Sequence, residues 1–362
     1  MRTKRNEVTA KQVAELAGVS QSTVSMILNN YDKASFTEVT RQKVLAACNT
    51  LGYKGFYEPG NINEKTILLI VPSLSNLSYV KQVTTAQQRA MELGYTCAIY
   101  NTFRNTSLEN NILTLIQSIP VSGVVFLYQP ENLSLLQRAG TIKTTVAVCD
   151  RNLDLKMDNI EVNSYGIGKI IAEHMISQGH THVMYIATDI STKYITRLQR
   201  LEGVKGCFRD HGIDENNIKL CTLKSENISI RGVSDDYQAG IMLIGKALKK
   251  YGDTCTGIIG YNDMICFGII DQLKRMNMTI PNDYSIIGCD NIYLSEMNSI
   301  ALTSVEHFAH LRARDAVELL VRKIKDKYEQ STDFSAMGIT RVEYEPRIVI
   351  RSSTKNIKKH HI

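Results

Sequence analysis

From Thr66 onward, the chain alternates between short apolar runs and longer segments in which apolar and polar residues follow helical spacing. Short apolar runs indicate buried strands, and the amphipathic segments between them indicate helices of about ten to fifteen residues. Strands that alternate with helices predict parallel sheets covered on both faces. About ten strands are too many for one compact sheet, so we expect an α/β body with two doubly wound parallel sheets. The predicted strands are ILLIV, TCAIY, GVVFLY, TVAVC, HVMYIA, IKLCTL, GIIGY and YSIIGC.

The first fifty residues have helical spacing and two helix-start signals on either side of a glycine. Thr9, with Gln12 three residues later, has the spacing of a capping box, and a face of Val13, Leu16 and Ala17 follows. Gly18 suits the left-handed turn that ends a helix. Ser20 is a second N-cap, and the helix after it has Val24, Ile27 and Leu28 on its inner face. With so short a turn the helices must cross steeply, which predicts a helix-turn-helix.

A third helix completes this unit. Thr37 can cap it, Gly52 can end it, and its inner face holds Val44, Leu45, Cys48 and Leu51. Three short helices then share one small core.

The second helix of such a unit presents polar side chains that fit the major groove of DNA. Lys11 and Arg41 are placed to contact phosphates, which fix the position of the protein on DNA without carrying sequence information. A helical pair used for protein contact is the alternative. The predicted base-contacting residues are Gln21, Ser22, Thr23 and Ser25.

The charge distribution favours a polyanionic partner for this unit. The whole chain has a net charge of +6. Residues 1–54 hold eight lysines and arginines against four acids, and residues 347–362 hold five basic residues and no acid. The middle of the chain is therefore mildly acidic, so the basic helical unit is the part expected to bind nucleic acid.

The helical unit strongly resembles the DNA-binding head of the lactose-repressor (LacI/GalR) family. The matching residues are VTAKQVAELAGVSQSTVS, Asn29, TRQKV and LGY. The resemblance implies that Gln21, Ser22 and Ser25 contact or position bases. The family commonly has a basic residue after the serine of TVS, whereas this chain has Met26. Methionine can touch a thymine methyl but cannot replace arginine on guanine, so the preferred operator is expected to differ.

Polar residues follow several predicted strands of the body, where open α/β sheets bind ligands. The segments are PSLSNLSY, YQPEN, CDRN, YND and GCDN. Aspartate, asparagine and arginine there suit a hydroxyl-rich ligand, and Tyr79 and Tyr128 could stack on a sugar ring. Each residue taken alone could equally be a helix cap or a turn former. Their recurrence after five strands favours a pocket.

The family resemblance continues through SQGHTHVMYIA, RLEGVKGCF, YNDMICFGIIDQLK, IPNDYSIIGCDN, LTSVEH and EPRIVIRSST. It implies that Asp150, Arg200, Asn262 and Asp290 contact a small effector, and that the body forms a homodimer matched to a pseudo-palindromic operator. It also implies a fold like that of periplasmic sugar-binding proteins, with two lobes around a cleft. The expected lobes are about 66–162 with 291–328, and 163–290 with 329–351, followed by a basic tail at 352–362.

Residues 55–65 occupy the position in which the family carries a short hinge helix that wedges the minor groove. Pro59 and Gly60 fall in the middle of the would-be helix, where they cost ~3 and ~1 kcal/mol. Phe56 and Ile62 are the only candidate wedges. We therefore expect an extended linker after the 1–54 head, with weak or absent wedging of the minor groove.

Cysteine and histidine spacing gives no metal or cofactor site. The eight cysteines contain no C-x-x-C pair and mostly lie in apolar runs, which predicts buried reduced thiols. His174, His180 and His182 are close in sequence, but a loop-to-strand entry separates them, so structural roles are favoured over metal binding.

The sequence therefore predicts a cytoplasmic, sequence-specific transcriptional repressor controlled by a sugar or sugar derivative. Control by a partner protein and action as an activator remain open alternatives. A solute-binding protein is disfavoured because no signal peptide precedes the body and a basic helix-turn-helix does. An enzyme is disfavoured because the chain has no G-x-S-x-G, P-loop, H-E-x-x-H or dinucleotide-binding motif, and no apolar run long enough for a membrane span.

Overall fold

The structure is a computed structural model. It describes residues 8–28, 36–51, 53, 65–151, 154–190, 194–223, 235–329 and 338–358. The chain divides into two compact units, Met1–Thr66 and Ile67–Ile362. The linker residues 55–64, including Phe56, Pro59 and Ile62, lie outside the described residues, as does Asn29, which the family resemblance assigns to DNA binding.

The first unit is the predicted three-helix head, with α1 at Ala10–Ala17, α2 at Gln21–Leu28 and α3 at Glu38–Leu51. The Thr9 amide donates to the Gln12 side chain (2.8 Å), and Gly18 has a positive φ of 67° where α1 ends. The prediction that Leu16 lies on the buried face of α1 is wrong, because its side chain is 53% exposed. The core instead takes Ala14, which lies on the other side of Val13 and Ala17 on the helix. The core residues are Val13, Ala14, Ala17, Val24, Ile27, Val44, Ala47 and Cys48.

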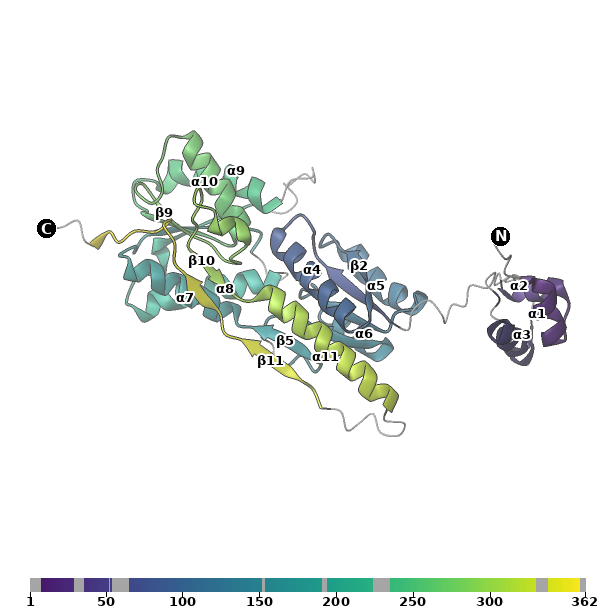
Figure 1. Cartoon of the computed structure of the whole chain (residues 1–362). Coiled ribbons are helices and arrows are strands. Elements are labelled where there is room, and N and C mark those ends of the chain that lie inside the picture. The colour runs from purple at the N-terminus through teal and green to yellow at the C-terminus, as the bar shows by residue number, and fades with distance from the viewer. Residues whose placement is uncertain are drawn as a thin grey trace. The chain divides into compact units, whose positions relative to one another are not determined.

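The second unit contains two lobes, each built on its own sheet (Figure 1). The first lobe has a six-stranded sheet in the order β11-β5-β4-β3-β1-β2. Helices α4 and α11 share a core on one face, and α5 and α6 share a core on the other. The strands are β1 Thr66–Val71, β2 Thr96–Asn101, β3 Gly123–Phe126, β4 Thr144–Ala147, β5 Asn159–Val162 and β11 Arg341–Tyr344, and the helices are α4 Leu77–Glu92, α5 Thr106–Ser118, α6 Ser134–Ile142 and α11 Ala309–Glu329.

The second lobe has a four-stranded sheet in the order β7-β6-β8-β9, with every pair parallel. Helices α7 and α8 cover one face, and α9 and α10 cover the other. The strands are β6 Val183–Thr188, β7 Ile218–Leu223, β8 Gly257–Gly260 and β9 Ser285–Ile287, and the helices are α7 Ser164–Ser177, α8 Ile195–Asp210, α9 Asp235–Tyr251 and α10 Asp263–Arg275. A separate antiparallel pair joins β10 Ser304–Glu306 to β12 Arg347–Val349.

The two predicted parallel sheets are confirmed, and all eight apolar runs form strands. The apolar pattern missed β5, β10, β11 and β12. The sequence of β5, NIEV, carries two buried polar residues. Asn159 and Glu161 satisfy each other there, because the Asn159 amide donates to the Glu161 carboxylate (3.1 Å). Within the described residues, no helix is both long and apolar enough to cross a bilayer.

The predicted lobe boundaries are wrong in two places, and part of the predicted tail belongs to the body. Residues 341–344, assigned to the second lobe, form β11 and pair with β5 of the first sheet. The chain also returns to the first lobe later than residue 291, because Ile292 and Leu302 pack in a core of the second lobe. The segment predicted as a tail is packed as far as residue 358. In it, Ser353 is 1% exposed and bonds both the Ile286 carbonyl oxygen (2.6 Å) and the Thr303 amide (2.8 Å).

Glycines set the distance between α7 and α8. A Cβ on Gly168 would lie 2.0 Å from the Arg200 carbonyl oxygen, and one on Gly203 would lie 2.0 Å from the Tyr165 carbonyl oxygen. Both contacts are with backbone, which cannot move aside as a flexible side chain can. The two helix backbones touch only because both positions lack a side chain.

We expect Gly203→Ala to destabilise the protein by about 1–3 kcal/mol or more, because the added methyl forces α7 and α8 apart. Urea denaturation measures the change in unfolding free energy. Gly245→Ala in α9 is the matched control, since a Cβ there meets no atom within 4 Å. The control should be neutral or stabilise by up to ~1 kcal/mol. Equal stability of the two variants would contradict this account of the helix contact.

Candidate functional site

On the head, Gln21 and Ser22 at the start of α2 are exposed, as are Lys11 and Ser25, and Met26 is half-buried. The cap of this helix involves two of the predicted base-contacting residues. Ser20 Oγ accepts from the Thr23 amide (3.1 Å), and it also bonds the hydroxyls of Ser22 and Thr23, both at 2.8 Å. Ser22 and Thr23 thus bond within the cap, and the neighbouring Gln21 has a longer polar side chain that is exposed. Thr23 contributes to capping, a role that the sequence analysis did not assign to it.

In the second unit, the predicted effector-contacting residues lie near the ends of strands or the starts of helices, except Arg200, which lies within α8. Tyr79 of the first lobe lies close enough to Arg104, Tyr261 and Asp290 for their charges to affect the pKa of its hydroxyl, which burial raises. Asn76 at the start of α4 donates across the lobes to Asp236 on α9 (3.4 Å). We call this region of the second unit the interlobe site.

Arg200 on α8 is the central cation of the interlobe site. Its side chain is 4% exposed and its guanidinium lies 4.6 Å from the centre of the Tyr261 ring. One Nη donates to the Tyr261 carbonyl (2.6 Å), while Nε is buried without a hydrogen-bond partner among the described residues. Asp150 is similar, because Oδ1 accepts from the Arg151 and Ser164 amides and Oδ2 has no described partner. Each unpaired buried group costs about 1–3 kcal/mol, so a polar ligand would be favoured here.

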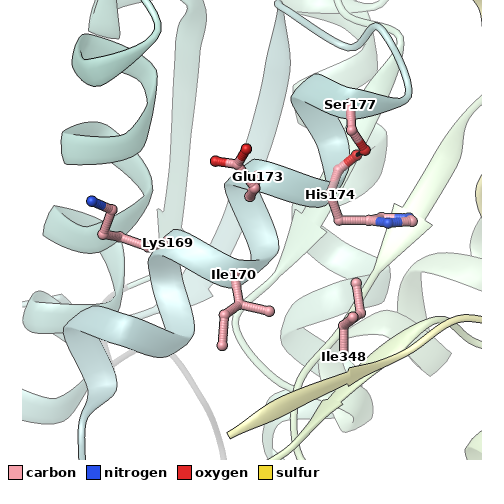
Figure 2. A pocket seen from close by; sticks show the side chains of 6 residues that line it. All are labelled: Lys169, Ile170, Glu173, His174, Ser177 and Ile348. Carbon is pink, nitrogen blue, oxygen red and sulfur yellow. Dashed lines mark hydrogen bonds between the residues drawn. The ribbon is translucent and has the colours of Figure 1, made fainter.

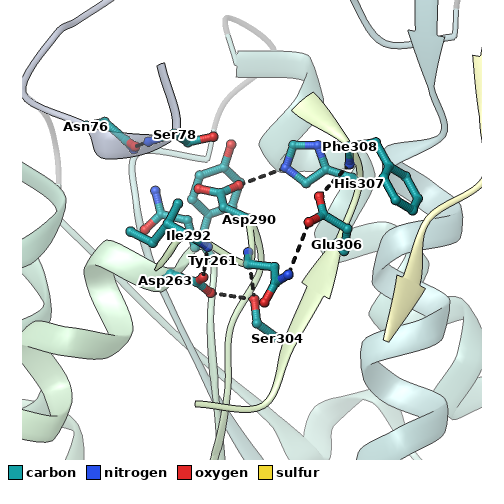
Figure 3. Close-up of polar contacts among 12 residues, drawn as sticks. Asn76, Ser78, Tyr261, Asp263, Asp290, Ile292, Ser304, Glu306, His307 and Phe308 are labelled. Carbon is teal, nitrogen blue, oxygen red and sulfur yellow. Dashed lines mark hydrogen bonds and ion pairs between the residues drawn. The ribbon is translucent and has the colours of Figure 1, made fainter. Parts of the chain in front are cut away.

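A hydrogen-bonded chain runs from Arg312 through His307 to Asp290. Figure 3 shows the contact between His307 and Asp290. A guanidinium can only donate, so His307 Nδ1 accepts from Arg312 (2.8 Å) and Nε2–H donates to Asp290 Oδ1 (2.9 Å). His307 is therefore a neutral histidine, in agreement with the lowering of its pKa by burial and by Arg312. Burial raises the pKa of Asp290 to about 7, against the opposing effect of Arg200.

Asn262 performs two structural tasks at the start of α10. Its side-chain oxygen caps the helix by accepting from the Ile265 amide (3.0 Å), and its amide donates to Asp236 Oδ2 (2.7 Å). The adjacent Asp263 is fully buried and accepts from the Ile292 amide and from the hydroxyls of Ser295 and Ser304 (Figure 3). Asp263 thereby fixes the segment between β9 and β10.

The two predicted aromatic residues are oriented by polar contacts. Tyr79 accepts from Arg104 (3.1 Å), while Tyr128 is 4% exposed and bonds Glu109 (2.6 Å) and Thr102 (3.0 Å). Tyr128 is therefore held in the first lobe, and Arg104 lies 5.6 Å from its ring centre.

Sequence reasoning missed several residues of the interlobe site. Arg104 lies in a turn in which residues 103 and 104 both have positive φ, and no apolar pattern predicts such a turn. Asp236 and Arg197 lie on α9 and α8, several residues beyond the ends of β7 and β6, so a search directly after the strands does not reach them. His307 directly follows β10, so a search of every strand end would have found it.

The histidine cluster has structural roles in the second lobe. His174 bonds the hydroxyl of Thr354 (2.9 Å), and His180 bonds Thr256 and the Lys355 carbonyl. These contacts hold the segment after β12 against the sheet. The prediction of buried free thiols is confirmed for six of the eight cysteines, and Cys97 and Cys221 are half-buried.

Comparison with known proteins identifies both units. Residues 9–55 match the model for bacterial regulatory proteins of the lacI family, and residues 172–354 match the periplasmic binding protein-like domain. The HTH-type transcriptional repressor PurR of Photobacterium profundum is 27% identical over 356 residues, covering 96% of this chain and 99% of that protein.

Solved structures share the fold. The transcriptional regulator CelR in complex with cellobiose has a TM-score of 0.64 at 21% identity, covering 96% of this chain and all of that one. A LacI family transcriptional regulator from Enterococcus faecium with bound ribose has a TM-score of 0.67 at 19% identity, covering 81% of this chain and all of that one.

We expect Asn262→Asp to destabilise the protein at pH 8 and less so at pH 5. The new carboxylate keeps the helix cap but faces the carboxylate of Asp236, so the two repel each other in the folded variant. As the pH falls, one of these two carboxylates takes up a proton and the repulsion disappears. Thermal unfolding at both pH values measures this. Asn105→Asp, at the exposed cap of α5, should leave stability unchanged, because aspartate caps helices as well as asparagine. A penalty for Asn262→Asp that does not depend on pH would contradict the interpretation.

Proposed function

The chain belongs to the LacI family of bacterial regulatory proteins, and we propose that it is a DNA-binding repressor whose operator affinity is set by a small carbohydrate. The observation that carries this proposal is the pair of unpaired buried groups, Arg200 Nε and Asp150 Oδ2, in a protein that also has a helix-turn-helix head. A ligand hydroxyl can accept from the first and donate to the second, as carbohydrates do.

The related proteins support a repressor role and a sugar effector for this chain, and the identity of the sugar is not part of the proposal. A related protein is named as a transcriptional repressor, and two proteins with the same fold contain cellobiose or ribose. The proposed contacts to the effector are made by Asp150, Arg200, Asn262 and Asp290, with Tyr79 and Tyr128 shaping the first-lobe side. A partner protein as the regulator, or activation in place of repression, is the alternative.

The proposed mode of DNA binding is that of a homodimer on a pseudo-palindromic operator. Each head would place α2 in the major groove, with half-sites spaced by the dimer symmetry. The body would transmit effector binding because ligand contacts come from both lobes, and a few kcal/mol of differential binding are enough to switch operator occupancy.

Gln21→Ala should weaken operator binding by about 1–3 kcal/mol and relax base preference at one position in each half-site, because the glutamine amide can contact a base edge. Lys11→Ala is the matched comparison, since this exposed side chain is proposed to contact phosphate. It should weaken binding to all sequences alike and lower the salt slope by about 1. Fluorescence anisotropy with operator variants at several salt concentrations distinguishes the two. Unchanged sequence preference in Gln21→Ala would remove this residue from base contact.

Effector binding should weaken as the pH falls from 8 to 6. An ionised Asp290 accepts more strongly from a ligand hydroxyl than a protonated one does. Burial raises the pKa of Asp290 above its ordinary value, so protons compete with the ligand for this carboxylate as the pH falls. The loss can reach about tenfold per pH unit. Isothermal titration against sugars and nucleosides first identifies a ligand, and no binding at millimolar concentrations would count strongly against a small effector.

The variant that tests the assignment is Asp290→Asn, which should bind more weakly and lose the pH dependence. Asp253→Asn, at an exposed position, should keep both the affinity and the pH dependence. If wild-type affinity is flat between pH 6 and 8, Asp290 is not the titrating contact.

A further inference from the structure

A second cluster of polar side chains lies away from the interlobe site, where the C-terminal half of α7 passes the last turn of α8. The glycine contacts at residues 168 and 203 hold the helices together, and further along them Glu173 faces Cys207 and His211. Cys207 and His211 are four residues apart and therefore share one face of α8. The three side chains carry three different potential metal-ligating atoms: oxygen, sulfur and nitrogen.

Two distances in this cluster are close to the edges of a metal coordination tetrahedron, one to each carboxylate oxygen of Glu173, and Cys207 Sγ also lies 3.8 Å from His211 Nδ1. Cys207 Sγ lies 3.3 Å from Glu173 Oε2, and His211 Nε2 lies 3.3 Å from Glu173 Oε1. All three residues bring a ligand atom within 4.8 Å of the others. A tetrahedral zinc ion with bonds of ~2.0–2.3 Å holds its ligand atoms about 3.3–3.8 Å apart. A small adjustment of side chains would therefore suffice to bind the ion.

The histidine is already oriented as a metal ligand. His211 Nδ1 lies 2.9 Å from the carbonyl oxygen of Cys207, which can only accept, so Nδ1 carries the proton. In the neutral ring the lone pair is consequently on Nε2, the atom that faces Glu173, and a metal ion would replace any proton held there. Metal-bound histidines characteristically donate their other ring nitrogen to a carbonyl in this way.

The cations beside the cluster are paired with acids other than Glu173. Lys169, the nearest lysine on α7, is paired with Asp210 (2.8 Å), and Arg209 is paired with Glu215. Neither cation is paired with Glu173. By contrast, the other possible cluster among the described residues, Cys289, Asp290 and His307, has both histidine nitrogens engaged.

The arrangement leaves room for a fourth ligand. Glu173 and His211 are partly exposed, while Cys207 is buried. Glu173 and Lys169 also line a pocket of about 340 Å³, together with His174 of the same helix and Ile348 of β12 (Figure 2). A water molecule can reach the cluster from solvent.

We propose that Glu173, Cys207 and His211 form a Zn²⁺ site on the second lobe, with water as the fourth ligand. Thiolate, imidazole and carboxylate together suit zinc better than magnesium or calcium, which prefer oxygen ligands. The ion would tie α7 to α8, the helix that also carries Arg200. This inference does not depend on the identity of the effector or on DNA binding.

The test is cobalt titration of the full-length, metal-free protein, since Co²⁺ replaces Zn²⁺ in such sites and its thiolate complexes absorb in the near ultraviolet. His360 and His361 are adjacent in sequence, so all proteins carry His360→Ala and His361→Ala to remove a competing pair. We expect a thiolate-to-cobalt band at one equivalent that zinc abolishes, together with a higher thermal midpoint in zinc.

Variants assign the ligands. Cys207→Ser should lose the band, and Glu173→Gln and His211→Gln should each weaken cobalt binding about tenfold or more. Cys97→Ser, a half-buried thiol in the first lobe, is the matched control and should behave as wild type. The two glutamine variants are at partly exposed positions and decide the matter if Cys207→Ser does not fold. No band in wild type, or a band indifferent to Glu173→Gln and His211→Gln, overturns the proposal.

Discussion

The hydrogen-bonded chain from Arg312 through His307 to Asp290 links the two lobes. Arg312 lies at the start of α11, whose following turns pack on the first sheet, and Asp290 follows the last strand of the second sheet. Arg312 and His307 are buried and the Asp290 side chain is nearly so, which means that each must find its partner inside the protein. Because arginine can only donate, the direction of every hydrogen bond in the chain is determined, and histidine is held neutral between a cation and a carboxyl group. A ligand that bonds Asp290 therefore acts on a group that both lobes hold in place.

The contact between α7 and α8 is the second constraint. Glycines let the two backbones touch, and the rigid pair then positions side chains at both of its ends. Toward the strand ends it presents Arg200, with a buried nitrogen available to a ligand. At the other end it brings Glu173 onto Cys207 and His211. A change in the distance between these helices would alter both groups of side chains together, which provides a physical route between the proposed zinc site and the interlobe site.

Several residues of the interlobe site were found from the sequence because they directly follow apolar strands. Asp150, Asn262 and Asp290 are of this kind, and parallel strands bring their carboxyl ends to one edge of a sheet. Arg104, Asp236 and Arg197 lie on turns or helices, where nothing in the local pattern separates a site residue from a solvated one. The zinc ligands are hidden for a related reason, because Glu173 and Cys207 come from different helices and no sequence spacing joins them.

Periodicity alone determined the three-helix head and eight strands of the two parallel sheets, since a buried strand or an amphipathic helix needs only its own residues to be visible. It failed at β5, where Asn159 and Glu161 are buried because they bond each other. It also failed at the lobe boundaries, because the chain crosses between lobes several times and which sheet accepts β11 depends on the free edge beside β5. Tertiary structure alone decided the tautomer of His307, the unpaired atoms of Asp150 and Arg200 and the grouping of Glu173 with Cys207 and His211. Each of these depends on distances between atoms that are remote in sequence, and the pattern of apolar and polar residues carries no information about such distances.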